Sequence, residues 1–111
     1  MAGKFELKAA AGDQFMFNLK AGNGQVILTS ETYKAKASAL NGIESVKKNA
    51  VKKEQFEKKQ SSKGDPYFVL KAGNGEIIGK SEMYSSESAM QNGIESVMEN
   101  APKAEIVDTT K

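Results

Sequence analysis

The sequence repeats itself at a fixed offset of 51 positions, and this duplication limits the possible folds more than any other feature. Identical residues recur at that spacing along both halves, among them Phe5 and Phe56, Tyr33 and Tyr84, and the segments 41–46 and 92–97. A repeat at constant spacing indicates that one structural unit occurs twice. A unit of about 50 residues buries little surface alone. We therefore expect a single domain, residues 1–111, in which repeat one (3–53) and repeat two (54–111) share one core.

Each repeat reads as three short strands followed by a helix. Alternating apolar and polar residues predict strands at 4–8, 14–20, 25–29, 56–60, 67–71 and 76–81. The Asn-Gly pairs at 23–24 and 74–75 are typical of tight hairpin turns. Apolar residues at spacings of three and four predict helices across 39–50 and 90–101, and 104–110 could add a short seventh strand or a tail.

This order of elements predicts an α+β fold. Two tandem βββα(β) repeats form one antiparallel sheet, with two helices packed on one face and pseudo-two-fold symmetry. Ser85 is the expected N-cap of the second helix, whereas Lys34 stands at the equivalent position of the first and defines its start less well. Gly42 and Gly93 lie within helical stretches, which suggests close approach of each helix to the sheet or to the other helix.

The residue types that are missing exclude most kinds of catalysis. The chain has no Cys, His or Arg, so it lacks a thiolate, the usual general base near neutral pH and the bidentate clamp for phosphate. We predict a non-enzymatic protein with no cofactor and no metal site. No long apolar run is present, and we expect a soluble, cytoplasmic chain that does not bind membranes.

Three motifs occur in the same order in both halves and closely resemble the YegP-like family of small bacterial proteins. They are Leu-Lys-Ala-x-Asn-Gly at 19–24 and 70–75, Ser-Glu-x-Tyr at 30–33 and 81–84, and Asn-Gly-Ile-x-Ser-Val at 41–46 and 92–97. The resemblance implies three strands, a helix and a further strand per repeat, with C-terminal strands exchanged between the halves. On that pattern 55–59 and 105–109 are the exchanged segments. The resemblance implies no activity and no catalytic residues.

One candidate site is a small-ligand or anion site where the third strand of each repeat meets the helix. Its residues are Ser30, Glu31, Tyr33, Ser81, Glu82 and Tyr84. Helix N-termini attract anions, and a hydroxyl group beside one could bind a small ligand. The alternative is that Ser caps the helix while Tyr packs over the sheet.

A second candidate site is a polyanion-binding edge rich in lysine, made of Lys47, Lys48, Lys52, Lys53, Lys58 and Lys59. Lysines neutralise phosphates without sequence preference, which would allow non-specific nucleic-acid binding. The alternative is a charged sheet edge that prevents aggregation.

A third candidate is an apolar interaction face on the side of the sheet that faces away from the helices, made of Met16, Ile27, Tyr67, Val69 and Ile78. Such a patch would suggest a protein partner, unless the chain ends cover it. The sequence thus favours a small, monomeric, non-enzymatic binding or protein-interaction module. Nucleic-acid binding through the lysine edge is the first alternative, and an enzyme built on the Ser/Glu/Tyr cluster is the second.

Overall fold

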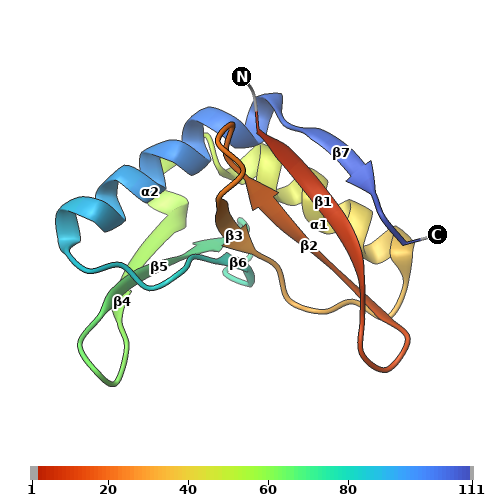
Figure 1. Cartoon of the computed structure of the whole chain (residues 1–111), viewed down its shortest axis with the longest axis horizontal. Coiled ribbons are helices and arrows are strands. Elements are labelled where there is room, and N and C mark those ends of the chain that lie inside the picture. The colour runs from red at the N-terminus through yellow and green to blue at the C-terminus, as the bar shows by residue number, and fades with distance from the viewer. Residues whose placement is uncertain (1–2, 111) are drawn as a thin grey trace.

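The computed structural model describes residues 3–110. The first half contains β1 (Lys4–Ala10), β2 (Gln14–Lys20), β3 (Val26–Thr29) and α1 (Lys36–Asn49). The second half contains β4 (Phe56–Gln60), β5 (Pro66–Lys71), β6 (Ile77–Lys80), α2 (Glu87–Asn100) and β7 (Glu105–Asp108), and short 3₁₀ turns, Lys53–Gln55 and Ala101–Lys103, precede β4 and β7. The predicted order of strands and helices is confirmed (Figure 1).

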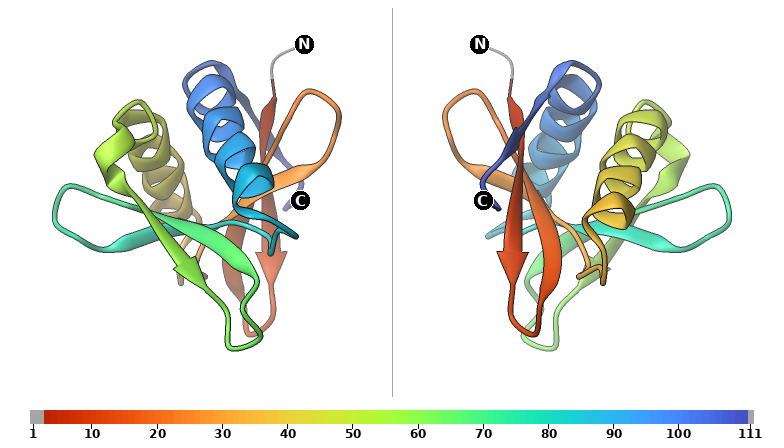
Figure 2. Two further views of the ribbon diagram at one scale, coloured as in Figure 1. Left: turned by 90° about the vertical axis from the view of Figure 1, so that its left-hand side faces the viewer. Right: turned by 90° about the vertical axis from the view of Figure 1, so that its right-hand side faces the viewer.

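All seven strands form one sheet in the order β4-β5-β6-β3-β2-β1-β7. The two halves meet at its centre, where β3 and β6 run antiparallel and Thr29 pairs with Lys80. Because Thr29 and Lys80 are equivalent positions of the repeat, the pseudo-two-fold axis passes between these two strands. Both helices lie on the same face of the sheet (Figure 2). The predicted two-layer α+β architecture is therefore confirmed.

The seventh strand departs from the antiparallel pattern. Strands β1 to β6 pair antiparallel with one another, whereas β7 pairs parallel with β1, with Glu105 opposite Lys4 and Asp108 opposite Leu7. The C-terminal strand of the second half thus extends the sheet of the first half, as the family resemblance implies for 105–109. The other segment expected to be exchanged, 55–59, instead lies in β4, which pairs with β5 as β1 pairs with β2. The sheet is consequently mixed, with β4 at one edge and β7 at the other.

The core lies between the sheet and the helices and draws equally on both repeats. Many of its fully buried side chains come in equivalent pairs, among them Phe17 and Phe68, Leu19 and Leu70, Ile43 and Ile94, and Val46 and Val97. Phe5 and Phe56 pack edge-on against Phe17 and Phe68 at 5.8 and 5.6 Å between ring centroids. The two small units thus bury their apolar side chains in one common core cluster.

The helix starts differ between the halves. The hydroxyl of Ser86, not that of Ser85, accepts a hydrogen bond from the backbone N–H of Ala89 at 3.1 Å and caps α2. The predicted cap is therefore wrong by one residue. At α1 the N-cap is Ala35, which has no side-chain bond, so the less well-defined start is confirmed.

Candidate functional site

Segments of both halves meet in a cleft of about 280 Å³ on the helix side of the sheet. We call it the turn–helix cleft. The β2–β3 hairpin of the first half contributes one wall, whereas Tyr84 and α2 of the second half contribute the other. The lining residues are Ala21, Asn23, Gln25, Ile27, Tyr84, Ala89, Asn92, Gly93 and Ser96. All three repeated motifs therefore contribute to one surface, because the pseudo-two-fold brings the turn of one repeat against the helix of the other.

Tyr84 is held in place by its ring. It stacks on Phe68 with ring centroids 6.2 Å apart and an interplanar angle of 10°. Its hydroxyl lies against α2 at Gly93, where an added Cβ would overlap the oxygen. Tyr33 stacks on Phe17 and meets Gly42 in the same way. The two helix glycines therefore make room for a tyrosine hydroxyl, which refines the prediction of a close approach.

The Tyr84 hydroxyl makes no hydrogen bond to any residue in the range 3–110 and is free to bind a ligand. Partial burial raises the pKa of Tyr84 above its usual value near 10, and the nearby Glu82 carboxylate raises it further. The pKa of Tyr33 is raised by burial first, then by Glu31 and Glu76. Both hydroxyl groups are consequently protonated at neutral pH and available as hydrogen-bond donors.

Asn92 is an exposed residue in the middle of α2, where Asn is a weak helix former. Its amide makes no hydrogen bond within the described part of the chain, and it lines the cleft beside Tyr84. Asn41 occupies the equivalent, equally exposed position in α1. Neither the helix nor the core accounts for an asparagine at this position in both repeats.

The pseudo-two-fold places an equivalent set of residues around Tyr33. There the β5–β6 hairpin of the second half supplies Asn74 and Glu76, and α1 supplies Asn41. The negative charge of Glu76 in this hairpin contributes to the raised pKa of Tyr33, after burial and Glu31. The main chemical difference is that Glu76 stands where the first hairpin has Gln25.

In the predicted Ser/Glu/Tyr cluster, the serine hydroxyls are hydrogen-bonded within the fold, whereas the glutamates are exposed. Ser81 is buried, and its hydroxyl accepts from Phe68 N at 3.0 Å and donates to Glu82 O at 2.8 Å. Ser30 makes the same two bonds, to Phe17 N and Glu31 O. Both hydroxyl groups are therefore occupied within the fold. Glu31 and Glu82 are exposed, and of the predicted set Tyr84 and Glu82 line an adjoining hollow of about 470 Å³ together with Gln25 and Val26.

The predicted apolar face is not assembled as expected. Ile27 and Ile78 are 7% and 8% exposed and belong to the core. The reason is a register shift at Leu19/Lys20 and again at Leu70/Lys71, which changes the alternation of side chains along β3 and β6. Val69 is 3% exposed, and only Met16 and Tyr67 of this set are partly exposed. The prediction that these five residues form an exposed patch is wrong.

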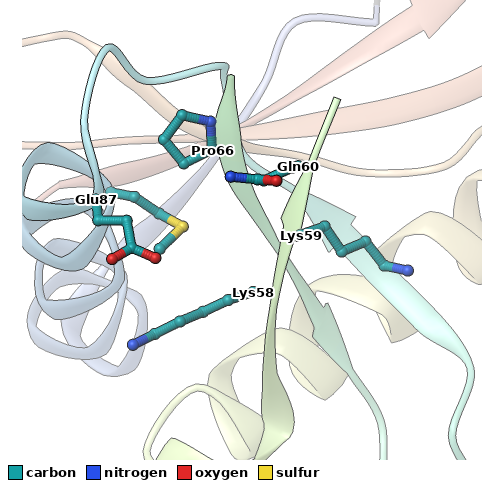
Figure 3. Close-up of a pocket in the computed structure, with 6 residues that line it drawn as sticks. Lys58, Lys59, Gln60, Pro66 and Glu87 are labelled. Atoms are coloured by element: carbon teal, nitrogen blue, oxygen red, sulfur yellow. The ribbon is translucent and has the colours of Figure 1, made fainter. Parts of the chain in front are cut away.

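The predicted lysine edge is distributed over several elements. Lys47 lies over the Phe5 ring at 5.9 Å, whereas Lys52 and Lys53 lie beyond the end of α1, and Lys48 lies in its last turn. On β4, Lys58 and Lys59 point to opposite sides of the strand (Figure 3). Lys59 lies 3.9 Å from Glu57 on the face away from the helices. The six lysines therefore do not share one face of the sheet.

A second cleft, of about 300 Å³, lies between β4 and the start of α2 (Figure 3). We call it the β4 groove. Its lining residues are Lys58, Lys59, Gln60, Pro66, Glu87 and Met90. Lys58 and Glu87 extend into it from opposite sides without forming an ion pair (Figure 3). The sequence pattern did not predict this groove, because the groove forms only at the edge of the sheet that β7 leaves uncovered.

Within residues 3–110 the structure shows neither a cluster of metal ligands nor a membrane-spanning helix. No three acidic side chains come together there as a metal ion would need. None of the helices described is long and apolar enough to cross a bilayer.

Comparison with known proteins identifies the repeat. The family model described as "Domain of unknown function (DUF1508)" matches residues 10–57 and again 61–108. The UPF0339 protein MS1092 of Mannheimia succiniciproducens is 56% identical over 109 residues, which are 98% of this chain and 96% of that protein. The UPF0339 protein YegP of Yersinia pestis is 53% identical over 97% of this chain and 96% of its own length.

Two solution NMR structures have the same fold. The UPF0339 protein SO3888 of Shewanella oneidensis superposes with a TM-score of 0.93 at 53% identity, over 99% of this chain and 93% of that one. The E. coli protein yegP, described as a protein of unknown function, also gives 0.93, at 49% identity over 99% of this chain and 95% of its own. The names of these relatives carry no activity. The chain therefore belongs to the DUF1508 family, as a tandem pair of its domain with UPF0339 proteins such as YegP as full-length relatives.

Proposed function

We propose that the protein is a non-enzymatic binding module that holds a small polar ligand in the turn–helix cleft and in its counterpart around Tyr33. One observation carries the proposal. Tyr84 and Asn92 have identical counterparts in the first repeat, line one cleft, and have side chains with no hydrogen-bonding role in the described fold. Clefts of a few hundred Å³ with a few convergent polar groups are the usual form of a small-molecule site.

The chemistry of the lining favours a neutral or positively charged ligand over an anion. The hydrogen-bonding groups are a phenol, side-chain amides and a serine hydroxyl, on an apolar base that includes Ala21 and Ile27. The charged side chain beside them is the Glu82 carboxylate. A phosphate or carboxylate ligand would meet this acid without a lysine among the lining residues to offset it.

The same groups argue for binding rather than catalysis. A tyrosine whose pKa is raised serves as a hydrogen-bond donor at neutral pH and is a poor base. The serines that might have acted as nucleophiles are buried and fully engaged with the backbone. No histidine or cysteine exists in the chain to replace them.

The test is an NMR screen of ¹⁵N-labelled protein against separate sets of neutral, cationic and anionic small molecules. We expect neutral or cationic compounds to shift the amides around Tyr84 and Asn92, and the equivalent amides around Tyr33 and Asn41. The double variant Asn41→Ala and Asn92→Ala should abolish these shifts and leave the fold intact, because the replaced side chains are exposed. Gln91→Ala, on the same helix but outside the cleft, is the matched control. Shifts produced by anions alone would contradict the proposal.

A further inference from the structure

The outer edge of β1 is covered by β7. Thr109 donates from its backbone N–H to the carbonyl of Leu7 at 2.9 Å, and from its hydroxyl to the same oxygen at 2.7 Å. Asp108, opposite Leu7, forms an ion pair of 2.8 Å with Lys36 in the first turn of α1. Under this strand, Phe5 and Leu7 are fully buried.

The equivalent edge, on β4, has no strand beside it within residues 3–110. Phe56 packs against Phe68 as Phe5 packs against Phe17, yet Phe56 remains partly exposed whereas Phe5 is fully buried. Lys58 stands where β1 has Leu7, and its carbonyl is the counterpart of the one that accepts from Thr109. Within the described residues, β4 thus has an open outer edge where β1 is covered by β7.

The β4 groove is the counterpart of the space in which Asp108 meets Lys36. The offset of 51 positions carries Lys36 onto Glu87 and Leu7 onto Lys58, and these two second-half residues line the groove (Figure 3). Within residues 3–110 the groove therefore provides an unpaired strand edge, a partly exposed phenylalanine beside it and Lys58, which can receive an acid. Glu87, at the position of Lys36, opposes such an acid.

We propose that β4 binds an extended acidic segment of a partner protein, added parallel to β4 as β7 is added to β1. In this register an apolar residue lies opposite Phe56, as Ile106 lies opposite Phe5, and an acidic residue lies opposite Lys58, as Asp108 lies opposite Leu7. The backbone edge supplies the hydrogen bonds, and the side-chain positions supply the preference for sequence.

Charge supports an acidic segment. Residues 52–63 contain five lysines and two glutamates, whereas residues 104–110, the covering strand of the first half, contain two acids and no lysine. Opposite charges on the two surfaces favour encounter and fix the register. A second copy fits less well, because β4 paired antiparallel with itself over its full length places Lys58 opposite Lys58.

The probe for this proposal is a blocked peptide with the sequence of residues 104–110, Ala-Glu-Ile-Val-Asp-Thr-Thr. Titrated into the ¹⁵N-labelled full chain, it should shift the amides of β4 and of the first turn of α2 in a saturable manner. A peptide with Lys in place of Asp should bind more weakly. Glu87→Lys, which restores the counterpart of Lys36, should tighten binding of the original peptide about two- to fivefold, the range that an exposed ion pair supplies.

The matched control is Glu99→Lys, the same charge change near the other end of α2. It should leave the affinity unchanged at a given ionic strength. Shifts confined to β1, α1 and β7 would mean that the peptide exchanges with the native β7, and they would overturn the proposal. Shifts of the β4 amides that depend on protein concentration without peptide would overturn the proposal in favour of self-association. Equal tightening of peptide binding by Glu87→Lys and Glu99→Lys would overturn it in favour of non-specific charge attraction.

Discussion

The ammonium group of Lys36 lies 2.8 Å from Oδ2 of Asp108 and connects the start of α1 to the last residue of β7. These residues are 72 positions apart in the chain. The contact holds the end of β7 in place. Because β7 lies beside β1 and no equivalent strand lies beside β4 within the described residues, the two edges of the sheet differ. Asp108 also accepts from the N–H and the hydroxyl of Thr110, which fold the chain back beyond the strand.

Asp108→Asn should loosen β7 and reduce the effect of acid on it. Lys36 first, and then Thr110, hold the pKa of Asp108 well below its usual range. A carboxyl group with a lowered folded-state pKa contributes stability above its unfolded pKa of about 4, and that contribution is lost as the pH falls toward the folded value. The protection factors of the amides of residues 105–109, which correct for the intrinsic pH dependence of exchange, should therefore fall below about pH 5 in the wild-type protein.

In the Asp108→Asn variant, these protection factors should already be lower at pH 7 and should depend less on pH. Glu105→Gln, which removes an exposed charge at the other end of β7, is the control. Because the Lys36–Asp108 pair is exposed, high salt should reduce the difference between wild type and variant. A pH profile identical to that of the wild type would show that this ion pair does not hold the strand.

Gly93→Ala should destabilise the protein, although Ala is the better helix former by about 1 kcal/mol. The new Cβ would overlap the Tyr84 hydroxyl oxygen, and the ring behind it is stacked on Phe68. Overpacking of this kind costs about 1–3 kcal/mol. Gly73→Ala is the control, since nothing lies within 4 Å of its Cβ position and its change should stay within about 0.5 kcal/mol. Urea denaturation measures both, and equal midpoints would refute the explanation.

The sequence predicted the hairpins and helices, because these depend on local residue patterns. The hairpins follow from Asn23-Gly24 and Asn74-Gly75, whose glycines have φ of 85° and 88°. Each Asn also accepts a hydrogen bond from the backbone two residues on, at 3.0 Å. The helices follow from apolar spacing, and duplication then fixes the second half once the first is known.

The candidate sites depended on contacts that a linear pattern does not encode. Strict alternation along β3 predicts that Ile27 faces away from the helices, whereas the register shift beside Lys20 places it in the core. The turn–helix cleft combines Gln25 with Asn92, which are neighbours only because the halves meet at β3 and β6. A useful signal was nevertheless present, since Asn41 and Asn92 are weak helix formers repeated within helices.

If both proposed positions bind the ligand, a cationic ligand should prefer the residues around Tyr33 to the cleft around Tyr84. Glu76 lies near Tyr33, whereas the uncharged Gln25 takes its place in the other cleft. In an NMR titration with a small amine, residues near Tyr33 should therefore reach saturation at lower concentration. Glu76→Gln should make the two clefts equal by weakening the first, and Gln25→Glu should do so by strengthening the second. Identical titration curves in the wild-type protein would show that this acid does not act on the ligand.

Ser81→Ala should cost about 1–3 kcal/mol, the penalty for leaving a buried polar group without its partner. The Ser81 hydroxyl is the acceptor for Phe68 N, on a strand whose side chains at 68, 69 and 70 are all buried. Removing the hydroxyl leaves that N–H without a partner. It also removes the hydrogen bond to the carbonyl of Glu82, two residues before Tyr84. Ser30→Ala should cost a similar amount, because the same pair of bonds exists in the first half. Ser85→Ala, at an exposed position, is the control, and a loss no greater than in this control would mean that water replaces the hydroxyl.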